Sequence, residues 1–173
     1  KYPVIFITLS GAKALTYKDC IRSLRNDIVD ELVQHGYLLQ SEKINEKEKE
    51  QFSYYYWEKA ESNEEYADAF LLLSRLLYKH HGLKPIILVD EYDVPLQNAV
   101  LNGFGKEMTS YIRRLFENTF KKNPYLGKGI ITGCLRVAKE SIFTGMNNLE
   151  VVGVMSKPYD EYFGFTKDEV KKA

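Results

Sequence analysis

Two patterns of apolar residues alternate along the chain. Short apolar runs, unbroken by charge and rich in Val and Ile, occupy residues 3–9, 86–89, 129–132 and 151–154. Longer segments between them carry apolar residues every three or four positions. The short runs are typical of strands inside a sheet, and the longer pattern is typical of amphipathic helices. The alternation predicts an α/β fold with a mainly parallel sheet flanked by helices, in which the strand at 3–9 is buried on both faces and is not an edge strand.

Helix signals occupy most of the remaining chain. Helices are predicted over residues 17–34, within the charged segment 41–59, over 62–82 and over 106–122. Ser, Thr or Asn followed three residues later by an acid marks the start of several of them, as in Asn45 with Glu48 and Thr166 with Glu169. The second pair predicts a helix that begins near the end of the chain. Residues 94–105 carry no clear helical pattern and are predicted to form a loop.

Two local clusters have both a structural and a functional interpretation. The aromatic residues of 52–57 could stack on nucleic-acid bases, but aromatics at helical spacing more often pack on a neighbouring element, and we expect packing. His80 and His81 could suggest a metal site. Adjacent residues on a helix point about 100° apart, so they do not easily share one ion, whereas cations are favourable at a helix C-terminus. We therefore expect the two histidines to serve the helix end.

Composition narrows the classes of protein. Hydrophobic residues make up 45% and charged residues 28%, which is typical of a globular protein. Basic and acidic residues number 24 each, so no overall positive field indicates nucleic-acid binding. No apolar run approaches the ~20 residues that cross a bilayer, and no signal peptide opens the chain, so we expect a cytoplasmic protein without membrane contact. Cys20 and Cys134 are expected to be buried, free thiols.

Acidic residues follow the apolar run at 86–89. Asp90, Glu91 and Asp93 stand where the predicted strand ends, and ligands of open α/β sheets bind at that end of the strands. The segment is a candidate Walker B motif: Asp90 would order the water shell of Mg²⁺, and Glu91 would orient the water that attacks a γ-phosphate. A solvated strand end without chemistry is the structural alternative.

Polar residues also follow the next strand. Thr132 ends the run at 129–132, and Arg136 lies four residues further on. Parallel strands place their carboxyl ends at one edge, so Asp90 and Thr132 are expected to share a crevice. There the Thr132 hydroxyl would position water, and the Arg136 guanidinium would stabilise the negative charge that develops on the phosphate. Arg136 could instead be an ordinary surface arginine.

A phosphate-binding loop is missing from the chain. No Gly-x-x-x-x-Gly-Lys-Ser/Thr segment occurs, and residues 103–106 have a similar composition without the spacing. The first strand begins almost at Lys1, so we expect a fragment that is inactive by itself, taken from a protein that is an ATPase. A metal-dependent nuclease is a weaker alternative, because an acid-x-Lys pair occurs only at Glu169 and Lys171, in the terminal predicted helix.

Five blocks of sequence carry a likeness to a known family. They are residues 1–5 (KYPVI), 85–96 (PIILVDEYDVPL), 131–136 (ITGCLR), 141–149 (SIFTGMNNL) and 162–166 (YFGFT). With these blocks the chain resembles the AAA-ATPase-like family of bacterial ATP-binding proteins, which often carry a PD-(D/E)XK nuclease-like domain.

The resemblance implies a P-loop-NTPase-like (AAA-type) core that lacks the Walker A segment, over residues 1–155, followed at 156–173 by the start of a helical lid. It implies ATP and Mg²⁺ as cofactors, Walker B roles for Asp90 and Glu91, a sensor-like role for Thr132 and phosphate contact for Arg136. Asp93 belongs to the same acidic motif. Asn147 and Asn148 look like a family marker, for which a side-chain-capped turn is the simplest account.

The implied function is ATP binding or hydrolysis coupled to another domain or partner, including an attached nuclease-like domain and, through it, nucleic acid. The alternative is a non-catalytic interaction module built on a degenerate NTPase scaffold, with the aromatic segment 52–57 contacting a partner. An intact phosphate loop elsewhere in the protein would favour the first function, and a degenerate one the second.

Overall fold

The computed structural model describes residues 1–134, 142–143, 149–153 and 167–172. The strands are β1 (Val4–Thr8), β2 (Ile86–Asp90) and β3 (Lys128–Ile131). The α-helices are α1 (Tyr17–Gln34), α2 (Glu46–Tyr56), α3 (Ala69–His81), α4 (Val94–Leu101), α5 (Gly105–Phe116) and α7 (Lys167–Lys172). Two 3₁₀ segments, η1 (Gly36–Gln40) and η2 (Asn63–Asp68), and a π-helical turn, η3 (Glu117–Lys121), complete the described elements.

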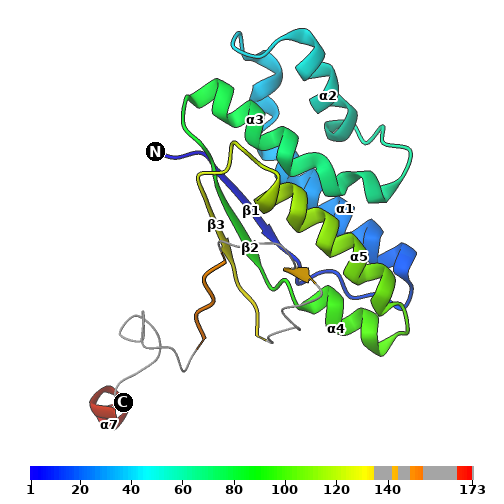
Figure 1. Ribbon diagram of the computed structural model, residues 1–173, viewed down its shortest axis with the longest axis vertical. Helices are drawn as coiled ribbons and strands as arrows, with labels where there is room; N and C mark the ends of the chain where they lie inside the picture. Colours follow the sequence, from blue (N-terminus) through cyan, green and yellow to red (C-terminus); the bar gives the residue numbers. More distant parts are fainter. Residues whose placement is uncertain (135–141, 144–148, 154–166, 173) are drawn as a thin grey trace.

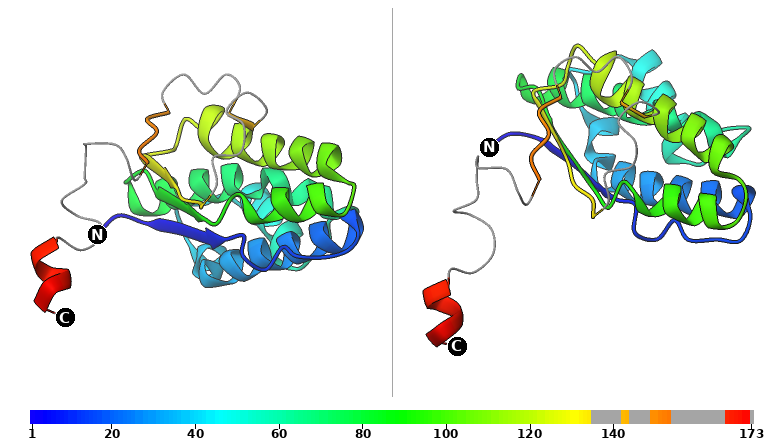
Figure 2. Two further views of the ribbon diagram at one scale, coloured as in Figure 1. Left: turned by 90° about the horizontal axis from the view of Figure 1, so that it is seen from below. Right: turned by 60° about the horizontal axis from the view of Figure 1, so that its bottom comes forward.

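The three strands form one parallel sheet in the order β1-β2-β3. Val4 pairs with Ile86, and Ile86 pairs with Lys128, so β2 is the central strand. Both connections between strands run through helices, and α1, α3 and α5 lie on the same side of the sheet (Figures 1 and 2). The α/β class, the parallel sheet and the flanking helices that the sequence predicts are therefore confirmed.

The prediction for the first strand is wrong, because β1 lies at the edge of the sheet among the described strands and one of its faces is exposed. Ile5 and Ile7 point into the core, whereas Val4 and Phe6 on the other face are 40% and 49% exposed. An apolar run thus marks a strand without showing that both faces are covered. The open edge is partly satisfied by α1, because the Phe6 backbone N–H donates to Glu31 Oε1 at 3.0 Å. The Glu31 side chain thus accepts a backbone hydrogen bond that no described strand accepts.

The predicted loop at 94–105 is also wrong, because most of it is helix α4. Pro95 lies in the first turn, where its missing N–H removes no intrahelical hydrogen bond. Leu96 and Ala99 are buried one turn apart and hold the helix on the core. The helix is short, and its buried residues, Pro95, Leu96 and Ala99, do not form a clear helical pattern in the sequence.

The C-terminal expectations have mixed outcomes. Residues 151–153 form no strand, and Val151 and Val152 are exposed, so the predicted strand is wrong for the described part of 151–154. The β-branched residues fit a strand only where a neighbouring strand pairs with them. The helix predicted from the capping pair at Thr166 and Glu169 is confirmed, because α7 begins at Lys167.

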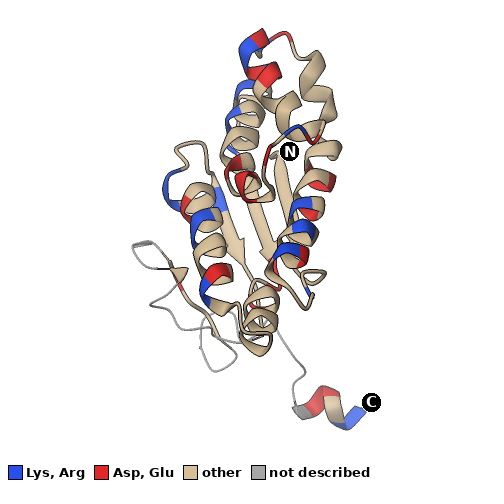
Figure 3. Ribbon diagram, turned by 90° about the vertical axis from the view of Figure 1, so that its right-hand side faces the viewer, with Lys and Arg blue, Asp and Glu red and all other residues tan. Residues whose placement is uncertain are grey.

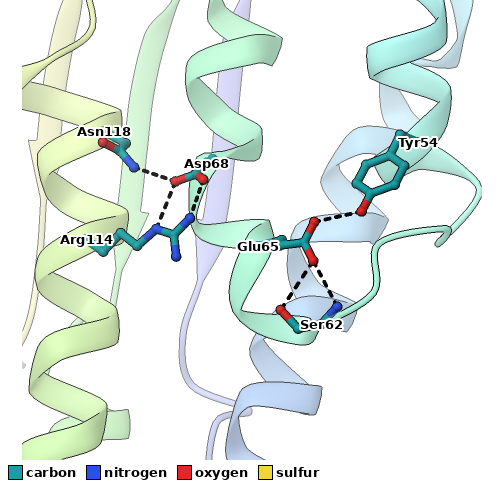
Figure 4. Close-up of polar contacts among 6 residues, drawn as sticks. All are labelled: Tyr54, Ser62, Glu65, Asp68, Arg114 and Asn118. Atoms are coloured by element: carbon teal, nitrogen blue, oxygen red, sulfur yellow. Dashed lines mark hydrogen bonds and ion pairs between the residues drawn. The ribbon is translucent and has the colours of Figure 1, made fainter.

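The helices are joined by polar contacts between side chains (Figure 4). Asp68 at the end of η2 accepts hydrogen bonds from Arg114 of α5 and from Asn118 of η3. Glu65 closes a capping box with Ser62 and also accepts a hydrogen bond from the Tyr54 hydroxyl at 2.7 Å. These bonds connect α2, η2 and α5, which are remote from one another in the sequence.

Most of the aromatic segment 52–57 packs on neighbouring elements as predicted, but Trp57 is 60% exposed. Phe52 is buried, and the Tyr55 ring lies 5.4 Å from that of Tyr66 in an edge-on arrangement. Charged residues of both signs are interspersed on the helices in the view of Figure 3, in line with the equal numbers of acids and bases. Within the described ranges, no helix has the length and apolar character needed to cross a membrane.

Candidate functional site

The carboxyl ends of the three strands lie along one edge of the sheet, beside the start of α4 (Figure 1). Thr8 at the end of β1 is in register with Asp90 at the end of β2. Thr132 directly follows β3. The edge therefore collects two hydroxyls and a carboxylate from three strands, as expected where ligands bind to a parallel sheet.

Asp90 is the centre of this group. Its Oδ1 accepts a hydrogen bond from the Thr132 hydroxyl and another, at 2.9 Å, from the backbone N–H of Glu91. Both bonds fix the carboxylate, because one comes from the neighbouring strand and the other from its own turn. Asp90 and Thr132, which the sequence places 42 positions apart, are thus in direct contact.

Backbone hydrogen bonds extend the strand pairing past β3. The Thr132 N–H donates to the Val89 carbonyl at 2.8 Å, and the Thr132 carbonyl accepts from the Tyr92 N–H at 3.1 Å. On the other side of β2, the Leu9 N–H donates to the Asp90 carbonyl at 2.9 Å. The backbone on both sides of Asp90 is therefore held by its neighbours, so the geometry of the site is built on the sheet and not on a free loop.

Glu91 has an unusual backbone. Its φ of 53° lies in the left-handed region, which residues other than glycine seldom adopt. A residue held there costs on the order of 1 kcal/mol, and such residues concentrate at functional sites. The Glu91 carboxylate is partly exposed and makes no hydrogen bond or ion pair with any described residue. It is available to accept a hydrogen bond from a ligand or from water.

Asp93 is buried behind this edge, with 1% of its surface exposed. Its Oδ2 accepts a hydrogen bond from Gln97 Nε2 at 2.5 Å, one turn along α4. A Cβ atom added to Gly133 would lie 2.6 Å from Asp93 Oδ1, so the two residues are packed tightly. This position suits a residue that fixes the turn after Thr132 more than one that contacts a ligand.

Two polar residues at the edge were missed by sequence reasoning. Thr8 is the last residue of β1 and Ser10 follows two residues later, with the Thr8 hydroxyl 3.1 Å from Ser10 Oγ. The Ser10 N–H donates to Thr8 Oγ1 at 3.3 Å. The signal was available, because polar residues that directly follow a predicted strand had already identified Asp90 and Thr132. Arg136, Asn147 and Asn148 lie outside the described residues.

The two cysteines differ from expectation in one respect. Both are free, as predicted, and Cys20 is buried. Burial raises the pKa of Cys20 to about 11. Cys134, two residues after Thr132, is exposed, so the prediction that it is buried is wrong. The apolar run before it ends at the edge of the sheet, where the chain turns towards solvent.

The residues at this edge suit a magnesium ion that arrives with phosphates. Carboxylate and hydroxyl oxygens are hard ligands, which Mg²⁺ prefers, and the ion usually keeps several waters and takes one or two carboxylates. Among the described residues, no group of three or more His, Cys, Asp or Glu could hold a metal ion. The edge therefore lacks a dedicated metal cage in the described part of the chain, but Asp90 and Thr132 fit an ion that phosphates and water also coordinate.

Comparisons with known proteins point to one family. A family model described as a predicted AAA-ATPase, of AAA-ATPase-like type, matches residues 1–143. The chain is also similar to a protein of Azotobacter chroococcum mcd 1 described as "Uncharacterized protein in vnfD 5'region", with 29% identity over 99 residues. The aligned part is 57% of this chain and 19% of that relative, so the chain spans about a fifth of the relative's length. No solved structure matches the chain.

Proposed function

Because the chain belongs to the AAA-ATPase-like family, we propose that the carboxyl edge of its sheet binds Mg-ATP within a P-loop-NTPase-type core. The proposal depends most on the hydrogen bond from the Thr132 hydroxyl to Asp90, which joins polar groups at the ends of two adjacent parallel strands. Ligands of open α/β sheets bind outside those ends. The Walker B and sensor assignments give this contact a chemical purpose.

Each residue of the edge has a distinct task in this proposal. Bound Mg²⁺ would neutralise charge on the phosphates. Asp90 would hold a water of the ion's shell, with its orientation set by the bonds from Thr132 and from the Glu91 N–H. Glu91 would accept a hydrogen bond from the attacking water and orient it. Asp93 would position the turn that carries Thr132.

The wider setting of this site forms part of the same proposal. ATP binding or hydrolysis would drive a change in another domain or partner, and a nuclease-like domain acting on nucleic acid is one candidate. Residues 1–155 would form the core, and α7 would belong to a helical lid that begins at 156–173. We place the protein in the cytoplasm.

The test separates binding from hydrolysis in the intact protein. Glu91→Gln should lower kcat for ATP by about 100-fold or more, because it removes the group that orients water, while the Kd for Mg-ATP changes by less than about threefold. Asp90→Asn should weaken ATP binding in Mg²⁺ but not in EDTA. Calorimetry and phosphate release measure these effects. Glu42→Gln, at an exposed acid, is the control. Unchanged turnover in Glu91→Gln would remove Glu91 from this role.

A second candidate function is a non-catalytic interaction module. A groove of about 710 Å³ lies beside α2 and α3, and its walls combine apolar and aromatic residues such as Tyr55 and Leu72 with charged residues such as Lys47 and Arg75. Grooves of this size with apolar walls and a few polar groups are common ligand sites. The two candidates differ in one measurement. If the intact protein binds no ATP with Mg²⁺ or without it, the nucleotide proposal fails and the interaction module is favoured.

A further inference from the structure

All three histidines of the chain gather around one tyrosine. Tyr37 lies in η1, and its ring centroid is 5.9 Å from that of His35 at the end of α1. It is also 5.3 Å from the ring of His80 and 5.9 Å from that of His81, both in the last turn of α3. α3 leads directly into the start of β2, so the cluster lies at the end of the sheet opposite the candidate nucleotide site.

His81, Tyr37 and His35 form a hydrogen-bond network that ends at the carboxylate of Glu31. The Tyr37 hydroxyl is 2.9 Å from His81 Nε2 and 3.4 Å from His35 Nδ1. His35 Nε2 is 3.1 Å from Glu31 Oε1, the same oxygen that accepts the N–H of Phe6 in β1. This hydrogen-bond network therefore connects α3, η1 and α1 with strand β1.

The number of protons on the two imidazole rings decides whether every hydrogen bond of this network can form. With both imidazoles neutral, His81 Nε2–H donates to Tyr37, whose hydroxyl donates to His35, whose Nε2–H donates to Glu31. With one added proton on His35, the direction of the Tyr37 bonds reverses and every contact is still satisfied. With a second proton on His81, both rings donate to the same phenol oxygen, and the Tyr37 proton has no acceptor among the three.

The surroundings oppose the second proton as well. Burial lowers the pKa of His81, and His80, His35 and Lys43 lower it further in that order. The His80 ring lies 4.6 Å from that of His81, and Lys43 Nζ donates to the His80 carbonyl at 2.6 Å. On this face, Glu31 is the acid that favours positive charge, and it already pairs with His35.

We propose that His35, Tyr37 and His81 form a one-proton clasp that holds η1 against the end of α3 and opens when His81 also becomes charged. The sign follows from the neutral state that the fold prefers. A histidine whose folded pKa is lowered contributes stability above its ordinary pKa, about 6.5, and that stability is lost as the pH falls. Mildly acidic pH should therefore release η1 while the sheet stays folded.

Hydrogen exchange of the η1 amides in the intact protein tests the clasp. Between pH 7.5 and 5.5, after correction for intrinsic exchange, opening of residues 36–40 should increase about fivefold or more, because doubly protonated histidines no longer satisfy the hydrogen bonds of Tyr37. In His81→Gln, whose side chain stays neutral, opening at pH 5.5 should be within about twofold of opening at pH 7.5. Lys18→Gln, at an exposed position near the opposite end of α1, should keep the wild-type increase.

The outcomes are distinguishable from loss of folding. The clasp is refuted if the wild type shows no increase, or if His81→Gln retains it while circular dichroism shows a native fold. If His81→Gln fails to fold, nuclear magnetic resonance titration of the wild-type histidines decides. His81 should titrate together with chemical-shift changes in η1, and a His81 titration that leaves η1 and the Tyr37 ring unchanged overturns the proposal.

Discussion

Gly133 allows the turn after Thr132 to lie directly on the buried acid of the Walker B candidate. A Cβ atom at this position would come 2.6 Å from Asp93 Oδ1 and 2.8 Å from the ring of Tyr92. Neither neighbour can yield easily, since Asp93 is buried and held by Gln97 and Tyr92 is nearly buried. The position of the Thr132 hydroxyl thus depends on a residue without a side chain.

Gly133→Ala should therefore destabilise the protein by about 2 kcal/mol, as is typical of overpacking, and should weaken ATP binding if the proposed site is correct. Urea unfolding at pH 7.5 measures the change in the free energy of unfolding. Gly11→Ala is a matched control, because its added Cβ would have its closest neighbour at 3.7 Å. We expect the control to change stability by less than about 0.5 kcal/mol. Equal effects of the two substitutions would contradict this account.

Asp27 on α1 gives the protein a pH dependence of the opposite sign to that of the histidine clasp. Burial, and secondarily Asp30, raises the pKa of Asp27 to about 6, and its buried Oδ2 has no hydrogen-bond partner among the described residues. A raised pKa means that the folded protein favours the protonated acid. The associated stability is fully present below about pH 4 and is lost as the pH rises through about 6.

Asp27→Asn should consequently stabilise the protein by about 1 kcal/mol at pH 8, with the half-buried position reducing the full linkage value. At pH 4 the substitution should have little effect, because the wild-type acid is already protonated. Denaturant unfolding at the two pH values provides the measurement. A stabilisation that is the same at both would show that the charge of Asp27 is not its cause.

The helix layer is held by polar contacts as well as by its apolar core. Arg114 of α5 donates two hydrogen bonds to Asp68 of η2, one from Nε at 3.1 Å, and Asn118 donates a third (Figure 4). A two-bond arginine–carboxylate pair is more directional than a single contact. It joins elements that the chain separates by more than forty positions, so it fixes how α5 lies against η2.

A double-mutant cycle of Asp68→Ala and Arg114→Ala should give a coupling energy of about 1 kcal/mol in unfolding experiments. The estimate stays small because both side chains are partly exposed. The pair of Asp19 and Arg22, within one turn of α1, serves as the control and should couple by about 0.3 kcal/mol. A coupling between Asp68 and Arg114 that does not exceed the control would show that the pair does not fix α5.

Elements with many buried residues at regular spacing could be predicted from the sequence. Features that depend on which strands lie alongside could not. Ile21, Leu24, Ile28 and Leu32 all proved to be buried on α1, because about three turns of consistent spacing leave one solution. The short helix α4 buries only Pro95, Leu96 and Ala99. The edge status of β1 and the exposure of Val151 depend on which strands lie alongside, and no local pattern encodes that.

The candidate site was predictable to a similar extent. Asp90 and Thr132 could be paired because parallel strands share a carboxyl edge, and the structure places them in contact. The left-handed backbone of Glu91 and the burial of Asp93 could not be foreseen, since both arise from how the turn packs on α4. Composition gave no indication that the three histidines, from two helices remote in sequence, would gather around Tyr37.

The two thiols of the protein report on its folding as a unit. Cys20 is buried, its Sγ donates to the Ala12 carbonyl at 3.2 Å, and its pKa is raised to about 11. Cys134 is exposed beside Thr132. Thiolates are the reactive species, so burial and a high pKa should both suppress the reaction of Cys20 at pH 8.

We therefore expect one thiol to react quickly with Ellman's reagent at pH 8 and the second to react only as the protein unfolds in denaturant. Mg-ATP should slow the reaction of Cys134 several-fold if nucleotide covers the edge of the sheet. Cys134→Ser identifies the fast thiol, because the variant should show no rapid phase. Two rapid phases in the wild type would contradict the buried position of Cys20.

The register of the sheet also sets the order in which the protein can assemble. Val4 pairs with Ile86, so β1 cannot pair with β2 until about eighty further residues have been synthesised. At usual translation rates of ~5–20 residues per second, this interval lasts about 4 to 16 s. During that time the apolar, β-branched residues of β1 lack this partner and are prone to aggregate. Expression of soluble protein should therefore depend on translation speed and on chaperones that protect the nascent chain.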